Sequence, residues 1–76
     1  MNIDELEQRA RLLRKEYPQV RIGQSLMLVL RDMDKEMYDK VRSTECDCFY
    51  NDSVIPAFYV YLYGNSAYRS SSQVAK

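Results

Sequence analysis

Apolar residues at the start of the chain recur at alternating steps of three and four positions, which is the spacing of one face of a helix. Pro18 follows this stretch, and the residue before a proline is pushed away from helical geometry. The pattern therefore predicts an amphipathic helix over residues 2–16, with Asn2 placed to cap it. The residues on its apolar face are Ile3, Leu6, Ala10, Leu13 and Tyr17.

The next apolar stretch covers more than one face of a helix, which is typical of a helix at the centre of a core. It predicts a central helix over residues 21–32. Gly23 lies near its start and costs about 1 kcal/mol relative to alanine, so we expect another segment to approach the backbone closely there. Asp34 is then placed to cap a third helix over residues 35–43. The residues that this helix turns inward are Met37, Tyr38 and Val41.

Helical periodicity is lost through the segment "ECDCFYND", residues 45–52, which we interpret as an ordered aromatic loop. A fourth helix is predicted over residues 55–63, because Pro56 suits a first helical turn and Gly64 suits a left-handed stop. The competing interpretation is a strand, since "FYVYLY" is rich in aromatic and β-branched residues with a period near two. Residues able to cap the segment that follows the loop are Asn51, Asp52 and Ser53.

Together these elements predict an all-α fold, a compact bundle of four short helices with an ordered aromatic loop. We expect a single helical domain over residues 1–63 and a flexible tail over residues 64–76, because the end of the chain is mostly small and polar. The predicted core consists of Leu6, Leu13, Leu26, Leu30, Val41, Phe49, Phe58 and Leu62.

Charge and targeting features limit the partners and the cellular location that we expect for the protein. Eleven basic residues balance eleven acidic ones, so charge alone favours neither nucleic acid nor an anionic membrane as a partner. The charged start of the chain is unlike a secretory signal, and the longest apolar run, residues 26–30, is far too short for a bilayer span. We therefore expect a cytoplasmic protein, with Cys46 and Cys48 as free thiols.

Residue types that usually carry catalysis or metal binding are scarce. The chain has no histidine, and Glu45 and Asp47 flank the thiols, which raises a thiol pKa rather than activating it. Zinc normally takes four ligands, so the two cysteines are interpreted as packing residues, with a zinc site shared between chains as the alternative. Asp47, Asn51 and Asp52 lack the spacing and glycine of a calcium loop. We expect a protein that is not an enzyme and has no catalytic residues, metal site or cofactor.

Two surfaces are candidates for binding a macromolecule. Tyrosine combines a large contact area with a polar tip, and the tyrosines of the loop and fourth helix predict contact with a protein partner or a second copy of the chain. These residues are Tyr50, Tyr59, Tyr61 and Tyr63. The alternative is weak nucleic-acid binding through a basic cluster, although acids on the same helix favour a solvated, ion-paired face. The cluster consists of Arg9, Arg11, Arg14, Lys15 and Arg21.

Short motifs between residues 20 and 62 resemble a family of small uncharacterised bacterial and phage proteins. Its pattern has an Arg-x-Gly-Gln helix start, a Val-Arg-Gly-Thr turn, an Asp-x-Phe-Tyr loop and an Ile-Pro-x-Phe helix start. Ser43 replaces the usual glycine and Cys48 stands where proline is frequent, so the resemblance does not make the thiols a shared functional element. It implies a phage or bacterial setting and no particular reaction. The matching residues here are Arg21, Gly23 and Gln24; Val41, Arg42 and Thr44; Asp47, Phe49 and Tyr50; and Ile55, Pro56 and Phe58.

Overall fold

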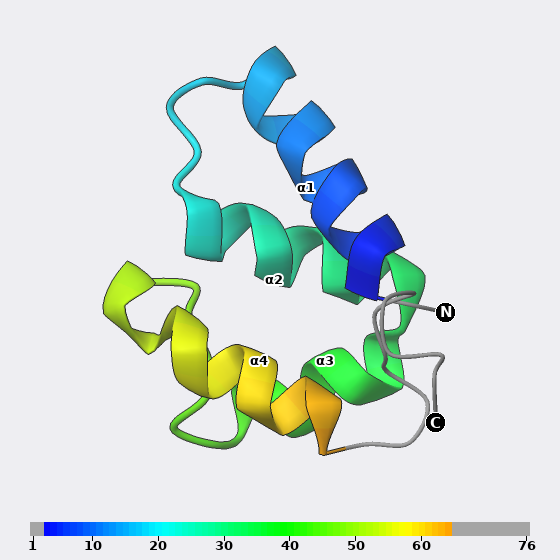
Figure 1. Ribbon diagram of the computed structural model, residues 1–76, viewed down its shortest axis with the longest axis vertical. Helices are drawn as coiled ribbons and strands as arrows, with labels where there is room; N and C mark the ends of the chain where they lie inside the picture. The colour runs from blue at the N-terminus through cyan, green and yellow to red at the C-terminus, as the bar shows by residue number, and fades with distance from the viewer. Residues whose placement is uncertain (1–2, 65–76) are drawn as a thin grey trace.

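The computed structural model describes residues 3–64 (Figure 1). The predicted cap Asn2 and all of the predicted tail except Gly64 lie outside this range. The helices are α1 (Ile3–Glu16), α2 (Ile22–Met33), α3 (Lys35–Arg42) and α4 (Ile55–Tyr63), with a 3-10 turn, η1 (Asp52–Val54), before α4. Over the described residues there is no strand, so the all-α prediction is confirmed and the strand interpretation of "FYVYLY" is wrong.

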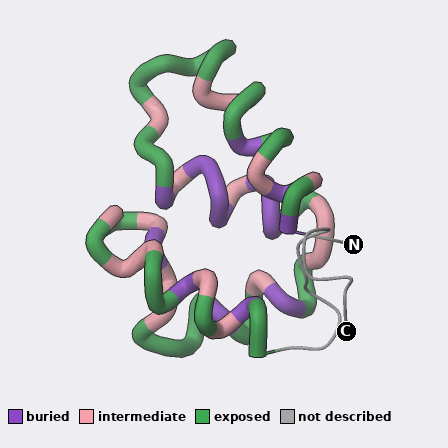
Figure 2. Tube along the Cα trace, viewed as in Figure 1, coloured by how far each residue is buried: buried purple, intermediate pink, exposed green. Residues whose placement is uncertain are grey.

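The central element of the bundle is α2, as its apolar pattern predicts. It packs against α1, α3 and η1. Figure 1 shows α1 on one side of α2, with α3 and α4 on the other side. The buried positions of the helices surround the interior between them (Figure 2).

The core is built from aliphatic and methionine side chains around Phe58, which has no exposed surface. Six predicted core residues are buried: Leu6, Leu26, Leu30, Val41, Phe58 and Leu62. Leu13 and Phe49 are only partly buried and pack against this cluster from outside. Buried hydrophobic residues that the predicted core did not include are Ile3, Ala10, Met27, Val29, Met37 and Cys48.

The helix ends confirm two predicted caps and correct one prediction. The Met37 N–H donates to Asp34 Oδ1 at 3.1 Å, so Asp34 caps α3 as expected. The Ser53 N–H donates to Asn51 Oδ1 at 3.0 Å, so Asn51 caps η1. Gly64 is not left-handed: its φ of −71° and ψ of −12° are right-handed helical. Its N–H donates to the Val60 carbonyl at 3.0 Å, so the helical hydrogen-bond pattern continues through this glycine.

Candidate functional site

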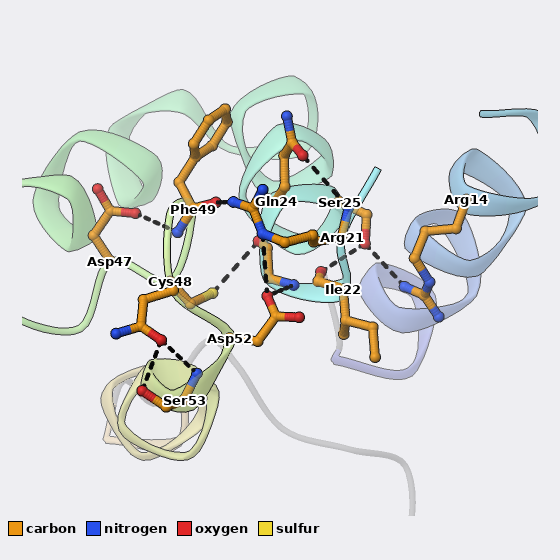
Figure 3. A network of polar contacts seen from close by, with 12 residues as sticks. Arg14, Arg21, Ile22, Gln24, Ser25, Asp47, Cys48, Phe49, Asp52 and Ser53 are labelled. Atoms are coloured by element: carbon orange, nitrogen blue, oxygen red, sulfur yellow. Dashed lines mark hydrogen bonds and ion pairs between the residues drawn. The ribbon is translucent and has the colours of Figure 1, made fainter. Parts of the chain in front are cut away.

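The first turn of α2 meets the aromatic loop in a contact that we call the junction, formed by Arg21, Gly23, Cys48, Phe49 and Asp52. The Gly23 N–H donates to Asp52 Oδ1 at 3.0 Å, and the Arg21 guanidinium donates to the Phe49 carbonyl (Figure 3). The first turn of α2 has no acidic residue of its own, so Asp52 supplies the negative charge that a helix N-terminus favours. The junction therefore fixes the loop against the central helix.

Gly23 confirms the predicted close approach of another segment to α2. A Cβ atom at this position would overlap the carbonyl oxygen of Cys48 and would lie 2.9 Å from Asp52 Oδ1. The Cys48 thiol donates to the Gly23 carbonyl at 3.5 Å, and burial raises the pKa of this thiol to about 12. Cys48 thus remains protonated at neutral pH and acts as a packing residue of the junction.

The predicted basic cluster is largely engaged by the protein itself. Arg9 pairs with Glu5 Oε2 at 3.0 Å, and Arg14 donates to the buried Ser25 hydroxyl at 2.9 Å. Arg21 belongs to the junction. Within residues 3–64, only Arg11 and Lys15 of the five cations have no hydrogen bond or ion pair. Three of the five cations therefore already have partners within the protein, which leaves Arg11 and Lys15 of α1 for an external anion.

The predicted tyrosines also differ in how far they are exposed. Tyr50 is 84% exposed and Tyr63 is 41% exposed. Tyr59 and Tyr61 are partly buried against the core, so they offer less surface to a partner than Tyr50 and Tyr63 do. The Tyr59 hydroxyl donates to Glu7 Oε2 at 2.6 Å, and burial together with this hydrogen bond raises its pKa. The α4 surface is therefore smaller than the sequence predicts.

Two residues of the predicted basic cluster and one of the predicted tyrosines line a small polar hollow of about 150 Å³ beside α1. Arg11 and Arg14 line it together with Glu7 and Tyr59. The Glu7 carboxylate and the Tyr59 hydroxyl bond to each other there. The carboxylate offsets the positive charge of the two arginines, so this hollow is not a strong anion site.

Three polar side chains of the aromatic loop and η1, those of Asp47, Asn51 and Asp52, accept hydrogen bonds from backbone N–H groups. Asp47 Oδ1 accepts the Phe49 N–H at 2.9 Å, Asn51 caps η1, and Asp52 caps α2. Cys46 is a partly buried free thiol. In the described part of the chain, no group of three or more cysteine, aspartate or glutamate side chains is arranged to hold a metal ion.

An apolar groove of about 380 Å³ lies between α1 and α2, and we call it the α1–α2 groove. Leu12 is 59% exposed there, although leucine is a residue type that is usually buried. The sequence interpretation missed this groove because Leu12 lies outside the apolar stripe of α1. An aliphatic residue on the polar face of that helix was the signal that could have revealed it. The aliphatic lining is Leu12, Leu13, Leu28 and Val29, and the charged lining is Arg9, Glu16, Arg31 and Asp32.

Comparison with known proteins adds no assignment. No protein-family model, curated protein or solved structure matches the chain. Among residues 3–64, no helix has both the length and the apolar character required to cross a membrane.

Proposed function

We propose that the chain is a small, non-catalytic protein-binding module whose docking surface is the α1–α2 groove. The observation that carries this proposal is the exposure of Leu12 in a concave surface lined by further aliphatic side chains. The occupant that fits is an amphipathic helix of a partner protein, which inserts its apolar stripe between α1 and α2. Fully burying an exposed leucine is worth about 1.5–3 kcal/mol, and Leu12 has 59% of its surface left to bury, so covering it would contribute about half of that value.

The charges of the groove support a protein occupant over a polyanion. Each helix contributes one cation and one anion: Arg9 and Glu16 come from α1, and Arg31 and Asp32 come from α2. An apolar centre with mixed charges around it is the usual anatomy of a protein interface. A nucleic-acid backbone would instead meet as many repelling charges as attracting ones.

The tyrosines of α4 form the weaker candidate surface. Tyr59 is partly buried with its hydroxyl engaged, and Tyr61 is partly buried as well. This leaves Tyr63 and the 72% exposed Val60 as the main apolar area that α4 offers. From the family resemblance, the setting that we propose is a cytoplasmic accessory protein of a phage or mobile element.

The test compares two matched substitutions, Leu12→Glu and Val60→Glu. In both variants a glutamate replaces an exposed aliphatic residue of a helix, and only Leu12 lines the groove. A tagged chain captures partners from a host lysate at moderate and high salt. The affinity of each variant is then measured for the purified partner. We expect Leu12→Glu to weaken binding at least about tenfold and Val60→Glu to leave it unchanged.

Circular dichroism must first show that both variants fold like the parent. Loss of binding in Val60→Glu and Tyr63→Ala, with Leu12→Glu unaffected, would place the docking surface on α4 and refute the groove. Capture of nucleic acid that is released by salt, with no protein partner recovered at either salt concentration, would refute the protein-binding proposal.

A further inference from the structure

A second hollow, of about 130 Å³, lies where the last turns of α2 and α3 meet the aromatic loop. We call it the Tyr50 pocket. Leu28 and Arg31 of α2 line both this pocket and the α1–α2 groove. The rest of the lining comes from α3, which contributes Tyr38 and Arg42, and from the loop, which contributes Asp47, Phe49 and Tyr50.

Tyr50 is presented to solvent on a segment that the fold holds in place. Its ring is 84% exposed and meets the Phe49 ring in an edge contact, with centroids 4.7 Å apart and planes inclined at 61°. The backbone of Phe49 is held on both sides, because its N–H donates to Asp47 and its carbonyl accepts from Arg21 (Figure 3). An aromatic ring carried next to a backbone held in this way has a surface ready for stacking, and a ligand need not order the loop to reach it.

Two guanidinium groups line the same pocket without partners among residues 3–64. Arg31 and Arg42 are both exposed, and neither makes a hydrogen bond or ion pair within that range. Asp47 supplies one negative charge, and its Oδ1 accepts the Phe49 N–H. The lining therefore has a net charge of one positive unit, and a bound anion would relieve the repulsion between the two arginines.

We infer that the Tyr50 pocket binds the base and phosphate of a nucleotide unit, with the base stacked on Tyr50 and the phosphate between Arg31 and Arg42. Pockets that enclose a small ligand have volumes of about 300–1,000 Å³, so this smaller hollow can hold only part of a nucleotide. The base then lies on the open surface, where single-stranded nucleic acid stacks on exposed aromatic rings. A free nucleotide offers the same chemistry, and the experiment separates these two sources.

A competing explanation exists for the two arginines, because both lie in the last turns of helices, where the helix dipole favours cations. That explanation predicts no ligand and no role for Tyr50. The nucleotide site and the groove also make separate predictions, since Tyr50 and Arg42 do not line the groove. The two sites share Leu28 and Arg31, but variants of Tyr50 and Arg42 test the inference separately from the proposed protein partner.

The experiment measures fluorescence anisotropy of a short fluorescein-labelled oligothymidylate, with unlabelled thymidine monophosphate as competitor. Tyr50→Ala has the matched control Tyr63→Ala, which removes another exposed tyrosine, and Arg42→Gln has the matched control Arg11→Gln. We expect Tyr50→Ala to weaken binding about tenfold. Arg42→Gln should also weaken it and lower the slope of log affinity against log salt by about 0.7. Both controls should bind like the parent chain.

Each outcome decides for or against the site. Competition by thymidine monophosphate as strong as that by unlabelled oligothymidylate, lost in Tyr50→Ala, supports the site with a free nucleotide as its ligand. Failure of both probes to bind at about 1 mM overturns the inference and favours the dipole explanation. Weakening by Arg11→Gln with no effect of Tyr50→Ala also overturns it, because binding would then lie on α1.

Discussion

The junction and the α1–α2 groove use α2 in opposite ways. At the junction, polar groups from distant parts of the chain satisfy one another: Asp52 accepts from the Gly23 N–H, and Arg21 donates to the Phe49 carbonyl. In the groove, aliphatic side chains remain accessible, and Leu12 keeps 59% of its surface exposed. Polar groups therefore hold the fold together at one end of the helix, while apolar groups stay open along another part of it.

This difference separates a structural role from a binding role. The junction resembles a polar site in its composition, but its donors and acceptors already have internal partners, so a ligand would have to replace bonds that hold the loop. The groove has apolar surface that water covers, and transferring it to a partner is favourable by about 25 cal/mol per Å². For this reason we place protein binding in the groove and assign the junction to folding.

The largest expected effect comes from removing the core on which both regions depend. Phe58→Ala deletes a fully buried ring and should cost about 3–5 kcal/mol. A domain of this length has a total stability of about 4–11 kcal/mol, so the variant should lose a large part of its stability and should unfold if the parent lies at the low end of that range. Urea denaturation followed by far-ultraviolet circular dichroism measures the loss. Tyr63→Ala, an exposed aromatic on the same helix, is the control, and equal stability of the two variants would contradict the assigned core.

The helices were predictable because their signals are local. The stripe of α1, the Asp34 cap and the position of Pro56 each act within a few residues, and the predicted boundaries agree with the observed ones to within one residue where both are described. The helix at residues 55–63 also shows that its terminal signals outweigh the β propensity of its aromatic residues.

The junction and the candidate binding surfaces were less predictable because they depend on contacts between distant residues. The sequence shows Asp52 as a loop acid and Arg21 as one of several cations, and nothing local indicates that they meet across the junction. The sequence correctly placed Phe58 and Leu62 of α4 in the core. It did not indicate that the Tyr59 hydroxyl bonds to Glu7 of α1, because those residues are far apart in the chain. The Tyr50 pocket likewise joins ends of helices that are neighbours only in the folded chain.

The next largest change in stability is expected from replacing Gly23 of the junction with alanine, with Gly64 as its control. Alanine for glycine in a helix normally stabilises by about 1 kcal/mol. Gly23→Ala should instead destabilise by about 2–3 kcal/mol, because the new Cβ overlaps the backbone of Cys48, which the junction holds in place. Gly64→Ala is the control: its backbone is right-handed, and the new Cβ would lie 3.4 Å from the nearest carbonyl oxygens, an ordinary contact. Thermal unfolding should show that the Tm of Gly23→Ala falls relative to the parent, while the Tm of Gly64→Ala rises or changes much less. Similar stability of the two variants would contradict the close packing at the junction.

The smallest effect tests the polar part of the junction alone. Asp52→Ala removes the acceptor for the Gly23 N–H and should cost about 1 kcal/mol, the usual value of a helix N-cap. The exposed ion pair with Arg21, at 3.9 Å, adds little. Asp52→Asn keeps an acceptor oxygen and should therefore lose less stability than Asp52→Ala. The control is Asp39→Ala, which breaks an exposed pair with Lys35 worth about 0.3–0.5 kcal/mol.

Urea denaturation gives these stability differences, and amide hydrogen exchange at Gly23 locates the loss. Because Asp52 does not line the α1–α2 groove, Asp52→Ala should retain the parent's affinity for a partner that binds there. A cost no larger than that of Asp39→Ala, with exchange at Gly23 unchanged, would mean that Asp52 does not cap α2. A large loss of partner binding in a folded Asp52→Ala variant would mean that the junction and the groove are coupled and that their structural and binding roles are not separate.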